Sequence, residues 1–139
     1  MAKIKLLVVS QEKKLTEETV DYVSAVTSEG EITILPGHIP LFSKLVTGEL
    51  RYGELGEQKS IIISKGFLTV GQNSTVTVMA DTAVDAREVS LEKATIAIKE
   101  AEETIKSTED NREKIMAEAA LRRALLEIRI AQRTKKTKI

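Results

Sequence analysis

The chain has 139 residues, of which 42% are hydrophobic but only 3% aromatic, so any core must be built from aliphatic side chains. It carries 21 basic and 21 acidic residues, and this balance gives no argument for a nucleic-acid partner. The chain has no cysteine, which excludes a disulfide framework, a thiolate metal site and a cysteine nucleophile.

A strand is predicted close to the amino terminus. Ile4, Leu6 and Val8 fall on one side of it and alternate with residues of the other side. The apolar run LLVV is too short for the core of a signal peptide. No apolar run approaches the roughly 20 residues that a membrane-spanning helix needs. We therefore expect a soluble intracellular protein.

Further short strands follow at close spacing. Lys13-Lys14 predicts a turn, and residues 19–27 are rich in β-forming residues and predict one strand. The other predicted strands cover residues 31–35, 41–46, 49–53, 59–64, 67–70 and 75–80, with polar or glycine-containing turns between them. Eight to ten such strands are typical of a β-sandwich or barrel.

Residues 30–50 include a stiff turn. This stretch holds both prolines of the chain, Pro36 and Pro40, and its only histidine, His38. Proline fixes φ and glycine permits positive φ, so Pro36-Gly37 predicts a type II turn. With apolar runs on both sides, the turn should be a fixed surface feature that acts on either a substrate or a partner.

The composition changes at residue 81. All seven glycines and both prolines precede it, and no glycine, proline or aromatic residue follows. We take this change as a domain boundary and expect a β-sandwich domain over residues 1–84 and a helical domain over residues 85–139. Asp85-Ala86-Arg87-Glu88 has the spacing of a capping box and predicts the start of a helix.

Two amphipathic helices of similar length are predicted in the second domain. The polar segment 107–111 separates them and supplies N-cap candidates. A short connection of this kind predicts an antiparallel helical hairpin. The apolar stripes consist of Ala94, Ala97, Ala101 and Ile105, and of Ala117, Leu121, Ala124, Ile128 and Ala131. Alanine buries little area, so the hairpin should be held together weakly.

The carboxyl-terminal end is basic. From residue 119 onward there are seven basic residues and one acidic residue, Glu127. The basic residues are Arg122, Arg123, Arg129, Arg133, Lys135, Lys136 and Lys138. Two interpretations are open. The basic residues lie at a solvated helix end, where their positive charges complement the helix dipole, or they bind an acidic protein surface. Phosphate binding is a third interpretation, but no aromatic residues interleave with the charges to stack on bases.

The residues that a catalyst would need are missing. His38 has no second histidine for a metal site and no evident triad partners, and no phosphate-binding glycine motif is present. Gly53-x-x-Gly56 is explained by turn chemistry. We predict no catalytic residue and no metal site, and we interpret His38 as a structural or interface residue of the turn.

The pattern G-x-x-x-x-L-P-G-H-x-P-L followed by L-x-x-G, with an alanine-rich helical hairpin after it, resembles the epsilon subunit of bacterial and chloroplast F-type ATP synthases. The residues that carry the resemblance are Gly30, Leu35, Pro36, Gly37, His38, Pro40, Leu41, Leu45 and Gly48. It covers essentially the whole chain. It implies a mixed β plus α fold, in which an amino-terminal ten-stranded β-sandwich precedes a carboxyl-terminal antiparallel two-helix hairpin.

The resemblance also implies a function. Members of this family are non-catalytic rotor subunits of the central stalk, and the sandwich couples the F1 head to the c-ring through the gamma subunit. The matching contact residues for the c-ring and gamma are Glu31, Pro36, Gly37, His38 and Pro40. The expected location is peripheral, at the cytoplasmic face of a bacterial membrane or the stromal side of a thylakoid, with the membrane contacted only through Fo.

The hairpin is the regulatory element of the family. It inhibits ATP hydrolysis when it extends into the catalytic head of alpha and beta subunits. Its basic end then meets an acidic segment of the beta subunits, and the matching residues are Arg122, Arg123, Arg129 and Arg133.

Some members bind ATP as a regulatory ligand through the motif Ile/Leu-Asp-x-x-Arg-Ala and two arginines four apart. Here Ser90 replaces the aspartate, Lys93 replaces the arginine, and Glu127 lies four residues after Arg123. Lys93 and Arg123 remain as candidate ATP contacts. Because a bidentate arginine is lost and a negative charge is gained, we expect weak or absent ATP binding, and no other cofactor.

Two alternatives stay open at this point. The chain could be a stand-alone β-sandwich adaptor whose helical hairpin docks a different partner. It could also be an enzyme or a ligand-binding sandwich with a site around His38.

Overall fold

The computed structural model describes residues 2–54 and 56–137, with side chains through residue 133. The chain divides into two compact units, Met1–Asp85 and Ala86–Ile139. The boundary lies one residue after the one expected from composition. Within the described residues, neither helix combines the length and the apolar character that a bilayer crossing requires.

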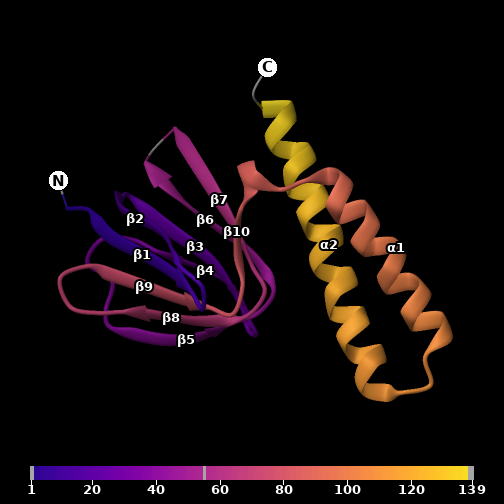
Figure 1. Ribbon diagram of the computed structural model, residues 1–139. Helices are drawn as coiled ribbons and strands as arrows, with labels where there is room; N and C mark the ends of the chain where they lie inside the picture. Colours follow the sequence, from indigo (N-terminus) through magenta and orange to yellow (C-terminus); the bar gives the residue numbers. More distant parts are fainter. Residues whose placement is uncertain (1, 55, 138–139) are drawn as a thin grey trace. The chain divides into compact units, whose positions relative to one another are not determined.

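The first unit consists of ten short strands (Figure 1). They are β1 (Ile4–Ser10), β2 (Lys14–Val20), β3 (Tyr22–Thr27), β4 (Gly30–Ile34), β5 (Leu41–Leu45), β6 (Gly48–Glu54), β7 (Glu57–Ile63), β8 (Gly66–Val70), β9 (Thr75–Ala80) and β10 (Ala83–Asp85). Their hydrogen-bonded order is β10-β7-β6-β3-β5-β8-β9-β1-β2, with β4 on β3. The pair β1 and β9 is parallel, and the other pairs of described strands are antiparallel. The predicted ten-stranded β architecture is confirmed.

The strands enclose one aliphatic core. In β1 the predicted alternation is confirmed, because Ile4, Leu6 and Val8 are buried. Inward residues of β8 and β9, such as Leu68 and Val78, join the same cluster. Tyr52 is the one aromatic member of this cluster of described residues, and burial of its ring raises the pKa of its hydroxyl.

The predicted turn at Lys13-Lys14 and the β prediction for residues 19–27 are confirmed in part. Lys14 begins strand β2, and the expected single strand over residues 19–27 is divided at Asp21, whose backbone N–H donates to the carbonyl of Gly53 at 2.9 Å. The strand β2 carries Thr16, Glu17 and other polar residues and pairs with β1 at one end of the strand order. A mostly polar strand has no hydrophobic alternation by which to recognise it.

Gly66 lies inside the β8–β9 ladder, where the sequence predicts a turn. A β-carbon at this position would lie 2.2 Å from the carbonyl oxygen of Met79 and 2.9 Å from the Cα of Ala80. The close approach of the two strands therefore requires glycine at this position.

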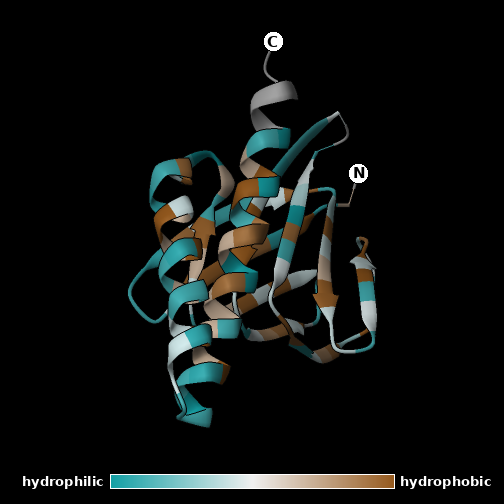
Figure 2. Cartoon of the chain, turned by 90° about the vertical axis from the view of Figure 1, so that its right-hand side faces the viewer, coloured by the Kyte–Doolittle hydropathy of each residue, from teal (hydrophilic) through white to brown (hydrophobic). Residues whose placement is uncertain are grey.

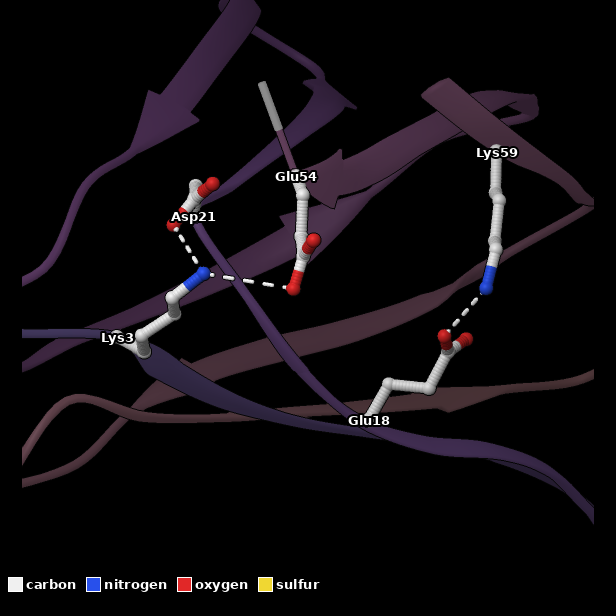
Figure 3. A network of polar contacts seen from close by, with 5 residues as sticks. All are labelled: Lys3, Glu18, Asp21, Glu54 and Lys59. Atoms are coloured by element: carbon white, nitrogen blue, oxygen red, sulfur yellow. Dashed lines mark hydrogen bonds and ion pairs between the residues drawn. The ribbon is translucent and has the colours of Figure 1, made fainter. Parts of the chain in front are cut away.

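Ion pairs connect strands that lie far apart in the hydrogen-bonded order (Figure 3). Lys59 of β7 donates to Glu18 of β2 at 2.6 Å. Lys3, which precedes β1, lies 3.0 Å from Asp21 and 3.4 Å from Glu54 of β6. The pairs Lys59–Glu18 and Lys3–Glu54 link the first part of the chain to the β6–β7 hairpin, and no backbone ladder of the described residues joins β1 or β2 to that hairpin.

The second unit begins with a 3₁₀ turn, Ala86–Glu88, followed by α1 (Leu91–Ser107) and α2 (Asn111–Thr137). The predicted helix start at Asp85 was wrong, because Asp85 ends β10 opposite Ile61 of β7. Ser90 caps α1 instead, and its hydroxyl oxygen accepts a hydrogen bond from the backbone N–H of Lys93 at 3.2 Å. The helices have 17 and 27 residues, so the expectation of similar lengths was also wrong.

The polar connection between the helices is confirmed, and it supplies caps to both. The backbone N–H of Thr108 closes the end of α1 on the carbonyl of Thr104 at 2.9 Å. The carboxylate of Asp110 accepts from the N–H of Arg112 at 2.9 Å, and the hydroxyl of Thr108 donates to Glu113 at 2.7 Å. The first two of these bonds satisfy backbone groups at the helix ends, and the third joins the two sides of the connection through their side chains.

The buried side chains of the helical unit are mostly alanines. Among the described residues they are Ala86, Ala94, Ala101, Ala117, Ala124, Ile130 and Ala131. Hydrophilic and hydrophobic residues are mixed along both helices (Figure 2). The predicted small-residue stripes are confirmed in part, because five of their alanines are buried whereas Ala97, Ile105, Leu121 and Ile128 are half-buried. Ile130 is a buried residue that the stripes did not include.

The ion pair between Glu18 and Lys59 generates a prediction about pH. Partial burial raises the pKa of Glu18, but hydrogen bonds from Lys59 and Thr16 lower it by more, so the net pKa lies below its ordinary value. A carboxylate with a lowered folded pKa stabilises the fold above its unfolded pKa of about 4.3, and this stability is lost as pH falls through the folded pKa. We expect Glu18→Gln to lower the free energy of unfolding by about 0.5–1 kcal/mol at pH 7, since the pair is partly exposed.

Urea unfolding at pH 7 and at a pH of about 3 checks this, with Glu12→Gln as the matched control because Glu12 is exposed. The difference between parent and Glu18→Gln should shrink at the lower pH. A difference that stays the same at both pH values would assign the effect to packing and contradict the ion-pair account.

Candidate functional site

The turn after β4 has the geometry expected for it. Gly37 has a φ of 85°, and the backbone N–H of His38 donates to the carbonyl of Leu35 at 3.1 Å. A positive φ at the third position and a bond from the first to the fourth residue fit the predicted type II turn.

The turn is also bonded to other groups of the sandwich unit. The backbone N–H of Gly37 donates to the hydroxyl oxygen of Ser74, in the β8–β9 turn, at 2.8 Å. The Nδ1 of His38 lies 2.7 Å from the carbonyl oxygen of Ile39, and since a carbonyl only accepts, Nδ1 carries the proton. His38 therefore fixes the backbone of its own turn, which fits its interpretation as a structural or interface residue.

Large apolar side chains are exposed beside this turn. Leu35 is 57% exposed and Ile39 75% exposed, and each directly precedes a proline. A single exposed apolar side chain needs no explanation. Two large ones exposed at the same turn fit a surface that contacts another protein.

A second group of exposed apolar side chains lies on neighbouring strands. Phe42 of β5 and Phe67 of β8 stack with their ring centroids 5.3 Å apart, and Met79 of β9 lies opposite Phe67 in the ladder. Their exposed fractions are 67%, 45% and 60%. We call Phe42, Phe67 and Met79 the aromatic patch. Aromatic residues and methionine are enriched in protein interfaces, so the patch is a candidate docking surface.

Sequence reasoning missed the aromatic patch. Its members alternate with buried residues such as Leu68 and Val78, so large apolar residues at outward strand positions were the available signal. Their proximity depends on the pairing of strands that are distant in the sequence.

The residues expected to contact gamma and the c-ring fall in two places. Pro36, Gly37, His38 and Pro40 lie in the turn or directly after it. Glu31 lies near the start of β4, about 10 Å along the strand from Ile34, and its carboxylate pairs with Arg51 of β6.

The predicted arginines of the hairpin all lie on α2. Arg122, Arg129 and Arg133 are exposed and recur at spacings of seven and four, which places them on one stripe of the helix. Leu125, 51% exposed, falls on the same stripe and was not predicted. The remaining basic residues Lys135, Lys136 and Lys138 lie outside the described side chains.

The candidate ATP contacts are engaged within the helices. Arg123 pairs with Glu127 one turn later at 3.1 Å. Ser90, at the position of the motif aspartate, is used as the cap of α1, and the Lys93 side chain is exposed. Among the described residues, no group of three or more His, Asp or Glu side chains is placed to hold a metal ion.

The family model described as "ATP synthase, Delta/Epsilon chain, beta-sandwich domain" matches residues 3–86. An ATP synthase epsilon chain of Syntrophobacter fumaroxidans is 40% identical over 132 residues, which cover 95% of this chain and 98% of the relative. The chain belongs to the ATP synthase epsilon chain family. Epsilon chains of Geobacter sulfurreducens and Herpetosiphon aurantiacus are 38% and 39% identical, and each alignment covers 93% of this chain and 94% of the relative.

Solved structures agree with this family assignment. A chain in the structure of the Euglena gracilis mitochondrial ATP synthase, OSCP/F1/c-ring in rotational state 1, is 28% identical with a TM-score of 0.75, covering 97% of this chain and 82% of that chain. A chain of the Tetrahymena thermophila mitochondrial ATP synthase central stalk/c-ring structure is 15% identical with a TM-score of 0.66, covering 93% of this chain and 96% of that chain, and shows the shared fold.

The geometry of Arg123 and Lys93 generates a prediction about ATP. Titration of the purified chain with ATP should show no saturation at low micromolar concentration. The carboxylate of Glu127 forms an ion pair with Arg123 and also repels the negative charge of a triphosphate. Glu127→Arg should bind ATP more tightly than the parent, and Glu118→Arg, an exposed position of the same helix, serves as the control for added positive charge. Saturation of the parent chain at low micromolar ATP would overturn this expectation.

Proposed function

We propose that this chain is a non-catalytic central-stalk rotor subunit of a proton-translocating F-type ATP synthase. Its sandwich unit couples the F1 head to the c-ring through gamma, and its helical hairpin inhibits ATP hydrolysis. The observation that carries the coupling part is the exposed aromatic patch, on the same unit as a turn in which the backbone N–H groups of Gly37 and His38 donate to Ser74 and Leu35.

The sandwich unit suits a stable attachment. Stacked Phe42 and Phe67 present rigid apolar area, and aromatic anchors of this kind supply much of the binding energy of protein interfaces. We assign the aromatic patch to gamma. The turn with Pro36, Gly37, His38 and Pro40 is assigned to the region where gamma meets the c-ring.

The hairpin suits a conformational change. Its buried side chains are mostly alanines, so separating its helices from their packed state exposes little apolar area. The stripe of Arg122, Leu125, Arg129 and Arg133 combines positive charge with one apolar side chain and is complementary to an acidic surface. We assign this stripe, with Arg123 beside it, to the acidic segment of the beta subunits and to the surrounding alpha and beta subunits.

A rotor subunit needs no catalytic group of its own. The proposed location is peripheral, on the cytoplasmic face of a bacterial cell membrane, with the bilayer contacted only through Fo. The three bacterial relatives named above support a bacterial location over a thylakoid one.

The coupling role is tested by Phe42→Glu. Phe42 is largely exposed, so the substitution should leave the unfolding midpoint nearly unchanged while it places an unpaired charge in the interface. Affinity for purified gamma should fall by about tenfold or more, as expected for an interface anchor. Ile115→Glu is the matched control, since Ile115 is similarly exposed on α2 and lies outside the patch.

Binding of gamma is measured by titration calorimetry or by co-purification of the rotor. Equal affinity of the parent and Phe42→Glu would remove the aromatic patch from the interface. Failure of the parent chain to bind gamma at all would contradict the rotor function and favour a stand-alone adaptor.

A further inference from the structure

We infer that Ser74 is a positioning residue, which holds the turn with Pro36, Gly37 and His38 in the orientation that docks to the rotor. This inference rests on the proposed function. Its first support is the hydrogen bond of 2.8 Å from the backbone N–H of Gly37 to the hydroxyl oxygen of Ser74, 37 residues further along the chain.

The hydrogen bond between Gly37 and Ser74 ties the turn to another part of the sandwich unit. The internal bond from His38 to Leu35 sets the shape of the turn, but it does not set the angle between the turn and the strands. The bond to Ser74 connects the central residue of the turn to the turn between β8 and β9, so it restricts that angle. Leu35 and Ile39, the exposed apolar side chains of this turn, are thereby held in place.

Ser74 is itself anchored. Its carbonyl oxygen accepts from the backbone N–H of Lys5 at 3.0 Å, which ties it to β1. The N–H of Gly71 donates to the carbonyl of Thr75 at 2.8 Å and closes the turn that contains Ser74. Two further hydrogen bonds therefore hold the backbone that carries the Ser74 hydroxyl. The hydroxyl can act as a fixed acceptor for the turn at Gly37.

The backbone of Ser74 is unusual for serine. Its φ is 55°, and that of Asn73 is 63°, so both residues are in the left-handed region. Asparagine and glycine adopt this region more readily than serine. Backbone strain of this kind is typical of functional positions, and the bond to Gly37 gives the Ser74 side chain such a function.

The bond contributes to docking more than to folding. Gly37 is exposed, so water can replace the hydroxyl of Ser74 as the partner of its N–H when the bond is lost, and no buried polar group is left unpaired. A turn that is free to reorient must instead be ordered when the partner binds, which lowers affinity. Removal of the hydroxyl should therefore reduce binding while the fold stays intact.

Ser74→Gly and Ser74→Asn separate the hydroxyl from the backbone conformation. Glycine adopts the positive φ without strain but has no acceptor, whereas asparagine also tolerates this φ and offers a side-chain oxygen to Gly37. The full-length variants are compared in thermal unfolding, in the amide exchange rate of Gly37 by NMR, and in affinity for the purified complex of gamma and the c-ring.

Ser74→Gly should keep the unfolding midpoint of the parent or raise it, speed exchange of the Gly37 amide, and lower affinity about threefold to tenfold. Ser74→Asn should restore both slow exchange and affinity. Unchanged exchange in Ser74→Gly would overturn the inference, and so would faster exchange with unchanged affinity. If the parent chain does not bind the complex of gamma and the c-ring, the proposed function fails and the docking role of Ser74 fails with it, although the exchange rates still test the hydrogen bond.

Discussion

The aliphatic core of the sandwich unit is the constraint on which the docking surface depends. Inward residues of short strands, such as Leu68 of β8 and Val78 of β9, fill this core and thereby fix the register of each strand. Side chains alternate along a strand, so burial of these two residues turns Phe67 and Met79 outward. A register shift of one residue would bury the aromatic patch and expose the core. The surface assigned to a partner is therefore set by the same packing that stabilises the unit.

The two units use different means of stabilisation, and this difference matches the roles proposed for them. Branched aliphatic residues and partly buried ion pairs, such as Lys59 with Glu18, hold the sandwich unit. The helical unit buries mainly alanines and relies on caps at Ser90, Thr108 and Asp110. A small apolar area gives a low free energy for local opening. A rigid unit for attachment and a more easily opened unit for regulation follow from the choice of core residues.

Much of the fold could be predicted from the sequence, because hydrophobic alternation in β1 and alanine spacing in the helices are direct signals of burial. Strand β2 could not be recognised, since Thr16 and Glu17 make it polar, and Asp85 has capping-box spacing although it pairs in the sheet. The turn at Pro36-Gly37 was predictable because both residue types restrict the backbone. The aromatic patch and the role of Ser74 were not, because each depends on residues that only the sheet pairing brings together. The contacts assigned to Glu31, to the turn with Pro36, Gly37, His38 and Pro40, and to the arginines of α2 stay predictions.

The division between an attaching unit and a regulatory unit is tested most directly by removing residues 86–139 and measuring ATP hydrolysis by the assembled ATP synthase. The shortened chain retains the aromatic patch and the turn, so it should still assemble with gamma and the c-ring. The assembled enzyme should then hydrolyse ATP faster than the enzyme with the full chain. Equal or slower hydrolysis by a fully assembled enzyme would contradict the inhibitory role of the hairpin.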